Sequence, residues 1–563
     1  MQMLLSRFYV FILLCCAPVV SGAQHKINIL GNVSDSQGFP IINADVYCAG
    51  IQSYSSKTDS LGNFSIELTE PGRYLIYVEQ SGFQKAEEEL LVISGKDARI
   101  EIKLEERAII LDEVAVSGVK DNPVTGSYTI PIEKALRMPA NFFDPLRLVT
   151  MLPGVSNGND QANGITIRGY SPNGLLWRLQ GLDIVNPNHL ANAGTLSDRP
   201  VANGGGVSML SSQVLDKSKF YYGTLPSNYG NALSGVMDMT LRKGNVSKPE
   251  YTLQTGLIGL DFAAEGPLRS NKNASYLVNF RASTVGLLSK AGVDFGGEKI
   301  NFYDLSFNLN FDHRKGGSFS VFGFGGRSTN SFSARPEDAW ETEKDRYNID
   351  FYGNTFAIGI RDERHISNRI MLKSGAAVSG QLQQRTSQSA VVPYAHTAFE
   401  KFESNRKLFS AFVVMSIKNN DRLSSEHGAT LTVTSDHQGL ELTQVSESYV
   451  PPVFNGKIRG AIIQPYSSWN LQLSRALFNV SARYLYFTFN GTGSFEPRSS
   501  LTWPVLKGSL TLGFGITSQI QQTQLYLNPE NRNLPLTRSA QTSLEYLRTL
   551  TNGFKLRSTI YYH

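Results

Sequence analysis

The chain has 563 residues, enough for several domains of the usual ~100–200 residues. Its 41% hydrophobic and 18% charged residues exclude a charge-rich disordered protein, and its 24 Tyr, 31 Phe and 50 Gly favour β structure over helical bundles. A net charge of +5 is small for this length, so it does not indicate a nucleic-acid partner. The only cysteines are Cys15, Cys16 and Cys48, which excludes a disulfide scaffold and a cysteine-based zinc site.

The first residues have the pattern of an export signal. Arg7 precedes the apolar run 8–20, which is too short to span a bilayer, and Ser21-Gly22-Ala23 supplies the small residues of a cleavage site. We therefore expect residues 1–23 to be a signal peptide. The alternative is a buried apolar strand. Cleavage after Ala23 leaves Cys48 as the one remaining cysteine, which then cannot form an internal disulfide.

Residues 24–105 are predicted to form a small β-sandwich, with short strands near 27–33, 44–48, 58–64, 73–78 and 100–104. The motifs G-x-V, D-x-x-G-x-P, A-x-V and T-D-x-x-G-x-F occur in this order and resemble the carboxypeptidase regulatory-like (transthyretin-like) domain. A zinc carboxypeptidase needs two histidines and a carboxylate on one metal, and His25 is the only histidine near this domain. We therefore expect a binding or spacer module with no catalytic residue, metal or cofactor.

Residues 106–119 are predicted to be a linker with an extended segment, formed by Leu111, Asp112, Glu113, Val114, Ala115 and Val116. The two valines point to one side of an extended chain, because successive side chains of a strand alternate. Such a segment can add as a strand to a partner's open sheet edge, where backbone hydrogen bonds provide affinity. The alternative is that it forms the last strand of the preceding sandwich.

Four further motifs lie within residues 120–245. They are L-V-T-M-L-P-G-V from residue 148, I-T-I-R-G from 165, G-L-D-I-V-N-P-N-H from 181 and Y-G-N-A-L-S-G-V-M-D-M from 229. With L-D-E-V-A-V-S-G from residue 111, they resemble the TonB box and the plug domain of TonB-dependent outer-membrane receptors that carry this N-terminal module. The resemblance implies TonB binding at 111–116 and a small α+β plug at 120–245. It implies structural or gating roles for Arg168, Gly169, Gly181, Asp183, Tyr229, Gly230 and Gly235.

Two features depart from the pattern of that family. Gln180 stands where the family usually has the aspartate of L-D-G, so this position keeps its hydrogen-bonding capacity but loses the charge of an ion pair. The K-D-A-S-A stretch of starch-utilisation-type glycan importers is absent, and Tyr222-Gly223-Thr224-Leu225-Pro226 stands near its expected place. The second departure weakens the case for a glycan importer with a lipoprotein lid.

Residues 246–563 alternate between apolar and polar side chains. Tyr303, Leu305 and Phe307 alternate with Asp304 and Ser306, and the pattern recurs near 276–283 and 510–517. One face then suits lipid and the other a wet lumen, although a soluble sandwich has the same period with the faces reversed. Short connections near 365–368, 507–508 and 551–553 separate long polar stretches at 329–353, 383–406, 443–459 and 521–537, which favours a membrane barrel.

These observations predict an all-β dominated chain: an N-terminal β-sandwich, a plug and a transmembrane antiparallel β-barrel. At the ~10 residues per strand of such barrels, the chain holds about 14 strands. The resemblance implies about 22, so we expect the barrel to be incomplete and the chain to be truncated at its C-terminus.

The resemblance implies an active importer in the outer membrane of a gram-negative bacterium. Its motor would be TonB with ExbB and ExbD, and its cargo a small solute such as a siderophore, metal chelate, peptide or oligosaccharide. A surface lipoprotein is a possible further partner. The alternative is a surface binding or adhesion protein anchored by the barrel, without transport. The chain contains no G-x-S-x-G, zinc or phosphate-loop motif, so we do not expect an enzyme.

No motif identifies the solute. Trp177 and Arg178 are candidates for substrate contact, with core packing as the alternative for Trp177. His189 and His396 have no metal-ligand spacing and are expected to be structural. A set of acidic residues could meet a cation or could simply form a solvated loop: Glu337, Asp338, Glu341, Glu343 and Asp345.

Overall fold

The computed structural model describes residues 27–35, 38–50, 53–83, 85–92, 96–104, 125–130, 145–157, 164–190, 203–256, 259–268, 273–285, 298–314, 316–341, 343–390, 398–420, 422–442, 454–473, 475–506, 508–550 and 554–563. The predicted signal peptide, the segment 111–116 and His396 lie outside the described residues. Within those residues, no helix has both the length and the apolar character needed to cross a bilayer.

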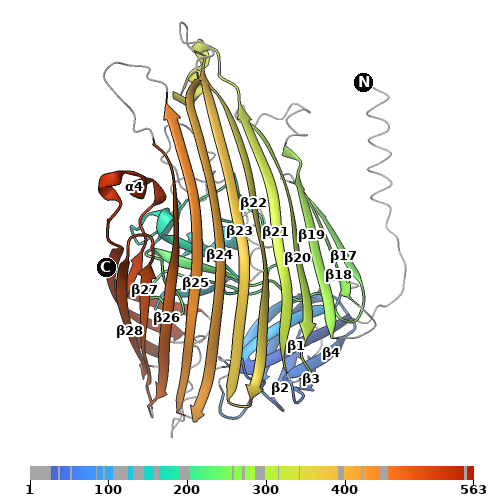
Figure 1. Ribbon diagram of the computed structural model, residues 1–563. Helices are drawn as coiled ribbons and strands as arrows, with labels where there is room; N and C mark the ends of the chain where they lie inside the picture. Colours follow the sequence, from blue (N-terminus) through green and yellow to red (C-terminus); the bar gives the residue numbers. More distant parts are fainter. Residues whose placement is uncertain are drawn as a thin grey trace, which may run out of the picture.

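The N-terminal domain is a two-sheet sandwich, as predicted (Figure 1). One sheet has the order β4-β1-β7 and the other β3-β2-β5-β6. The strands are β1 (Ile27–Asp35), β2 (Asp45–Ala49), β3 (Ser53–Lys57), β4 (Asn63–Leu68), β5 (Gly72–Glu79), β6 (Ala86–Val92) and β7 (Ala98–Leu104). Two of them, β3 and β6, were not predicted. Both are edge strands with polar sequences, SYSSK and AEEELLV, and such polarity hides the strand signal while it protects an edge from aggregation.

Alternate residues of these strands fill one apolar core between the two sheets. Ile29, Val46, Ile76 and Val78 are fully buried there, and Cys48 lies among them. Burial raises the pKa of the Cys48 thiol to about 11, because the thiolate would lose its hydration. We therefore expect this thiol to be inert in the folded domain.

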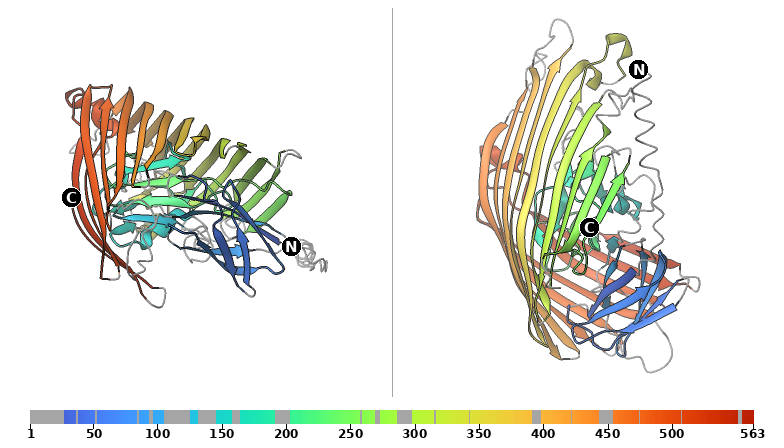
Figure 2. Two further views of the ribbon diagram at one scale, coloured as in Figure 1. Left: turned by 90° about the horizontal axis from the view of Figure 1, so that it is seen from below. Right: turned by 90° about the vertical axis from the view of Figure 1, so that its right-hand side faces the viewer.

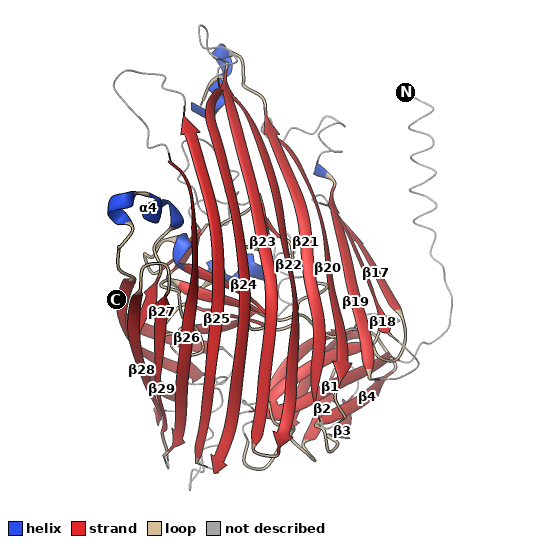
Figure 3. Cartoon of the chain, viewed as in Figure 1, coloured by secondary structure: helices blue, strands red, loops and turns tan. Residues whose placement is uncertain are grey.

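A 15-stranded antiparallel sheet, called here the large sheet, makes up the second half of the chain (Figure 3). Its strands pair in chain order, and the sheet curves as an open arc around the domain that precedes it (Figure 2). They are β17 (Glu250–Thr255), β18 (Gly259–Pro267), β19 (Ala274–Ser283), β20 (Glu298–Asp312), β21 (Gly317–Phe332), β22 (Tyr347–Ser367), β23 (Ile370–Ser389), β24 (Ala398–Asn420), β25 (Leu423–Leu442), β26 (Phe454–Gln472), β27 (Leu477–Phe487), β28 (Thr492–Val505), β29 (Gly508–Gln519), β30 (Thr537–Thr549) and β31 (Lys555–Tyr562).

The apolar face of the large sheet points outward. In β20, Tyr303 is 50% and Leu305 47% exposed, whereas Asp304 is 1% and Ser306 0% exposed. In β29, Leu512 and Phe514 are exposed, while the residues between them face inward. A soluble sandwich would bury the apolar face. The alternation therefore has the sense expected of a membrane barrel.

The middle strands are longer than predicted. The polar stretch 329–353 was expected to be a loop, but β21 continues to Phe332 and β22 begins at Tyr347; the stretch 383–406 is likewise mostly strand. A strand of 21 residues at ~3.3 Å per residue exceeds the ~25 Å apolar band of a barrel. Beyond that band both faces are polar, so pairing continues while the sequence alternation disappears. The described parts of the connections contain four short helices: η3 (Glu337–Ala339), η4 (Glu343–Arg346), α4 (Thr523–Leu527) and η5 (Pro529–Asn531).

The domain within the arc, called here the plug, spans the described residues between 125 and 241. A five-stranded sheet of order β12-β11-β16-β15-β8 is its centre, and β9-β10 and β13-β14 are small pairs. Its elements are β8 (Ser127–Ile130), η1 (Pro145–Met151), β9 (Val155–Asn157), β10 (Ile165–Ile167), η2 (Pro172–Gly174), β11 (Leu175–Leu179), β12 (Leu182–Asp183), β13 (Asn188–His189), β14 (Val207–Ser208), β15 (Ser218–Tyr221) and β16 (Gly235–Met239).

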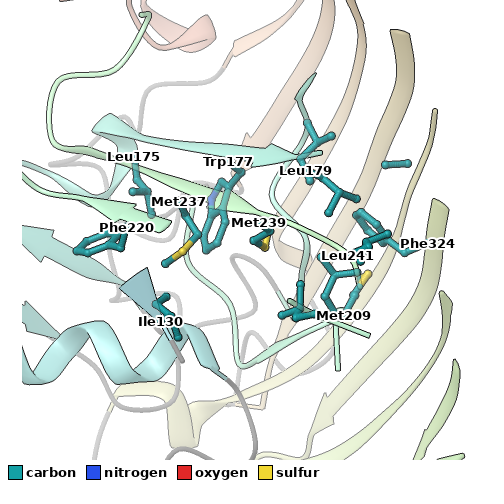
Figure 4. Close-up of a cluster of buried hydrophobic side chains, with 14 of the residues drawn as sticks. Ile130, Leu175, Trp177, Leu179, Met209, Phe220, Met237, Met239, Leu241 and Phe324 are labelled. Carbon is teal, nitrogen blue, oxygen red and sulfur yellow. The ribbon is translucent and has the colours of Figure 1, made fainter. Parts of the chain in front are cut away.

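The plug shares its hydrophobic core with the large sheet. Trp177, Met237 and Met239 lie together in this core, and Phe324 of β21 packs against the same cluster (Figure 4). Because one core joins the two parts, the plug is packed onto the inner face of the sheet.

Candidate functional site

The candidate functional site is the contact between the plug and the inner face of the large sheet, since a solute crossing the sheet's interior would have to disturb it. Described plug contacts extend from β17 to β31. Near one end, Gln213 donates to Gln254 of β17 at 3.2 Å, and Asp261 of β18 accepts a hydrogen bond from Ser211. Near the other, Glu545 of β30 accepts one from the backbone amide of Gly126, with N and Oε2 3.1 Å apart, and Arg557 of β31 donates to the carbonyl oxygen of Ser127 at 2.9 Å.

Two arginines of the large sheet hold one plug loop, residues 224–230. The Nη1 atom of Arg498 in β28 donates to the carbonyl oxygens of Leu225, Pro226 and Tyr229 at 3.1, 2.5 and 2.7 Å, and its Nη2 pairs with Glu496 at 2.6 Å. The Nη1 atom of Arg483 in β27 donates to the carbonyl oxygen of Ser227 at 2.7 Å. Charge-assisted bonds of this kind are stronger than neutral ones, and these are buried from water.

Gly230 lets this loop approach the large sheet closely. A Cβ atom at residue 230 would stand 2.3 Å from both Arg483 Nε and Gln464 Oε1, which themselves bond to each other at 3.1 Å. A similar constraint applies to Gly235, where a Cβ atom would stand 2.5 Å from the carbonyl oxygen of Tyr221. The structure thus gives close-packing reasons for both glycines.

Arg178, Asp183 and Tyr229 form one polar cluster within the plug. Arg178 Nε lies 3.2 Å from Asp183 Oδ1, and the guanidinium carbon stands 4.9 Å from the centre of the Tyr229 ring. The Tyr229 hydroxyl donates to Asp238 Oδ2 at 2.8 Å. Asp183 also accepts a hydrogen bond from Thr432 of β25 at 3.0 Å, so the cluster reaches the large sheet.

The two candidates for substrate contact are both buried. Trp177 is 2% exposed and belongs to the plug core, and Arg178 is 6% exposed and pairs with Asp183. In this conformation neither side chain faces solvent, and their contact with a substrate stays a prediction.

Gln180 makes a contact across the interface without a charge of its own. Its residue adopts a positive φ of 54°, in a tight turn with Gly181 at 82°. The Gln180 Oε1 atom accepts a hydrogen bond from Arg361 of β22 at 3.2 Å. The hydrogen-bonding role expected for this position is therefore present.

His189 joins the plug to β20. Its Nε2 atom lies 2.9 Å from Asp304 Oδ2, and Arg281 of β19 pairs with the same carboxylate at 2.8 Å. Burial lowers the pKa of His189 below its ordinary value of 6.5, although Asp304 opposes this shift. The imidazole is therefore neutral near pH 7 and acts as a structural link.

Arg168 and Gly169 form a tight turn at the end of β10. Both have positive φ, and the Arg168 amide donates to the carbonyl oxygen of Gly154 at 2.7 Å. The guanidinium stacks on Tyr561 of β31, with 4.2 Å to the ring centre. The described contacts of the guanidinium are thus with aromatic rings, Tyr561 and Tyr222.

The acidic loop residues whose side chains are described do not converge on a cation site, and the side chain of Glu343 lies outside the described part. Asp345 pairs with Arg335 at 3.3 Å and accepts a hydrogen bond from the amide of Glu341 at 3.0 Å, while Glu337 and Asp338 lie in η3. Throughout the described part of the chain, no group of three or more His, Cys, Asp or Glu is placed to hold a metal ion.

Arg483 and Arg498 were not predicted from the sequence. The signal was an arginine at an inward position of an otherwise alternating strand, as in Ser481-Ala482-Arg483-Tyr484. Sequence spacing cannot reveal which plug carbonyls such an arginine meets, because the partners lie more than 250 residues away.

Comparison with known proteins agrees with the fold and its N-terminal module. Residues 28–105 match the carboxypeptidase regulatory-like domain family. A mutant of the ferric enterobactin receptor PfeA of Pseudomonas aeruginosa is similar in structure, with a TM-score of 0.57 and 14% identity over 78% of this chain and 70% of that one. A search of the curated proteins finds no match.

Two further solved structures are similar. The siderophore receptor PirA of Acinetobacter baumannii has a TM-score of 0.55 and 14% identity, over 77% of this chain and 75% of that one. The outer membrane transporter YddB of Escherichia coli has a TM-score of 0.55 and 11% identity, over 76% and 68%. The chain therefore carries a carboxypeptidase regulatory-like domain and has the fold of these receptors, as its motifs predicted.

Proposed function

We propose that this protein is a receptor of the gram-negative outer membrane that imports a scarce solute by displacement of its plug. The observation that carries the proposal is the buried contact between the plug loop 224–230 and Arg483 and Arg498, inside a sheet whose apolar face points outward. Lipid would cover that outer face. A solute could then pass along the inner face only if these contacts were broken.

Breaking them requires work from outside the molecule, because the outer membrane has no ATP. We propose that TonB, driven by ExbB and ExbD, pulls on the segment 111–116, which precedes the first described plug residue, Thr125, by nine positions. An extended segment can pair with a partner's sheet edge through its backbone. This role for Leu111, Asp112, Glu113, Val114, Ala115 and Val116 rests on their sequence.

The proposed cargo is a small solute such as a siderophore, metal chelate, peptide or oligosaccharide. Two of the similar structures are siderophore receptors, which makes a ferric siderophore the first solute to test. A surface lipoprotein remains a proposed further partner. The protein acts here as a receptor without covalent chemistry, so no catalytic residue or cofactor is assigned.

The test is solute uptake by cells that carry a deletion of 111–116. A deletion of 118–123 is the matched control, because it shortens the same linker by the same length. We expect the first deletion to abolish uptake of a bound ferric siderophore while surface binding persists, and the second to retain uptake. Undiminished uptake without 111–116 would refute the proposal that TonB pulls on this segment. Binding by the intact chain without any uptake would favour the adhesion protein instead.

A further inference from the structure

The N-terminal domain lies at the end of the large sheet where the connections are short (Figure 1). Just after β1 it presents Phe39, which is 7% exposed although it does not belong to the core of its own domain. The ring stands 5.5 Å from that of His365 in β22. Next to it, a Cβ atom at Gly38 would stand 3.0 Å from Met371 Cε in β23. An aromatic side chain at a turn tip is thus buried by another part of the chain.

Hydrogen bonds to Asp35 hold the backbone of Phe39 in place. Asp35 Oδ1 accepts from the Phe39 amide at 2.8 Å, and the Asp35 amide donates to the Phe39 carbonyl oxygen at 2.8 Å. Phe39 therefore loses little conformational freedom when it meets the sheet, and preorganisation of this kind favours docking.

A second contact joins the domain to β17 and β18 through charges. The backbone amide of Asp97 donates to Glu250 Oε1 at 2.8 Å, and Lys96 pairs with Glu265 at 3.0 Å. Glu265 is 3% exposed at its side chain and also binds Arg242, just past the plug, at 2.7 and 2.8 Å. One buried carboxylate therefore joins the N-terminal domain, the large sheet and the segment that leaves the plug.

A third contact reaches the plug directly. Lys217, one residue before β15, pairs with Glu88 of β6 at 2.8 Å. Its Nζ atom also donates to the carbonyl oxygen of Glu101 in β7 at 2.9 Å. The plug is thus tied to the N-terminal domain as well as to the sheet.

From these three contacts we infer that the N-terminal domain is a brace. It docks through Gly38 and Phe39, and through Glu88, Lys96, Asp97 and Glu101, onto the rim of this chain's own large sheet and onto the plug. The brace holds the plug from the side opposite the long loops. Its contacts are one aromatic ring and a few ion pairs, and such mixed interfaces within a chain open readily. The N-terminal domain therefore undocks from the sheet and the plug before the plug moves.

The test measures hydrogen exchange of the full chain in detergent, without solute or TonB. The reporter is the Asp97 amide, because Glu250 accepts its hydrogen bond only when the domain is docked. We expect Phe39→Ala with Lys217→Glu to speed its exchange about tenfold, which corresponds to ~1.4 kcal/mol of lost docking. The control pairs Ile42→Ala, which is 50% exposed in the same region, with Lys85→Glu, whose partner Glu79 lies in the same domain. In this control variant, the Asp97 amide should exchange at the wild-type rate.

An unchanged exchange rate of the Asp97 amide in the first variant would overturn the brace proposal. An equal rise of this rate in the control variant would overturn it too. Amides of β5 must stay protected in every variant, which shows that the domain remains folded. A second comparison guards against misfolding: Glu88→Lys with Lys217→Glu should exchange more slowly than Lys217→Glu alone, because the ion pair is rebuilt in reverse. Failure of that rescue would also count against the brace. The import proposal does not depend on either result.

Discussion

At the scale of single residues, side chains of the large sheet hold the plug through hydrogen bonds to its backbone. Arg498 and Arg483 donate to carbonyl oxygens of the plug loop, and Gly230 gives them room. A buried arginine whose partner is removed keeps an unpaired charge, at a cost of several kcal/mol. The loop and its arginines should therefore stay together until force separates them.

Gly230→Ala is predicted to loosen this loop. The new methyl group would fall 2.3 Å from Arg483 Nε, so the arginine or the loop must shift. Overpacking of this kind costs about 1–3 kcal/mol. Hydrogen exchange should speed up at residues 224–230, whereas Gly256→Ala, where the nearest atom is 3.9 Å away, should leave it unchanged. Equal exchange in both variants would contradict the packing role.

His189 is predicted to make the plug less stable in acid. Burial keeps its pKa in the folded protein below the ordinary 6.5, so the unfolded chain binds the proton first as the pH falls. Stability is then complete above about pH 6.5 and is lost below it. The urea midpoint of plug unfolding should drop more between about pH 7.5 and about pH 5.5 in the wild type than in His189→Gln. A larger drop in the variant would reverse the assigned sign.

The sequence predicted some of these residues and not others. Gly230, Gly235, Asp183 and Tyr229 could be named from the sequence because they lie in motifs that are contiguous in the chain, and their gating role stays a prediction. The arginines of β27 and β28 were not, because a contact between distant strands leaves no local pattern. Trp177 was ambiguous for a physical reason: an aromatic ring suits both a ligand site and a core.

At the scale of elements, alternation predicted the strands of the large sheet wherever lipid would meet them. It failed at the polar ends of β21 to β24, and at the edge strands β3 and β6, where neither face shows an apolar period. Pairing there depends on the neighbouring strand, which a reading of local sequence does not include.

An arginine on the outward face of β20 is predicted to make folding into lipid less favourable. Leu305→Arg would place a charge where lipid is expected, at about 2–4 kcal/mol near the bilayer midplane. Gln388→Arg is the control, since Gln388 is exposed near the end of β23, where the outward residues are already polar. The free energy of folding into lipid vesicles checks this. If both substitutions cost the same, the outward face of β20 does not meet hydrocarbon.

At the scale of the whole molecule, three parts are joined by few, specific contacts. The plug shares a hydrophobic core and buried hydrogen bonds from arginines with the large sheet, whereas the N-terminal domain touches both through one ring and a small set of charges. In the proposed import, the plug is released from the large sheet, and the proposed brace is released before it. The same contacts that keep the resting state closed set the work that a motor must do.

The most direct test of the account is a disulfide that locks the plug to the sheet. The Thr125 and Ser543 hydroxyls contact each other, one in the plug and one in β30, so Thr125→Cys with Ser543→Cys should form a disulfide. Cys48 is buried and should not compete. We predict that the oxidised protein binds its solute but does not import it, and that a reductant restores import. Import at the wild-type rate by the fully oxidised protein would contradict the account.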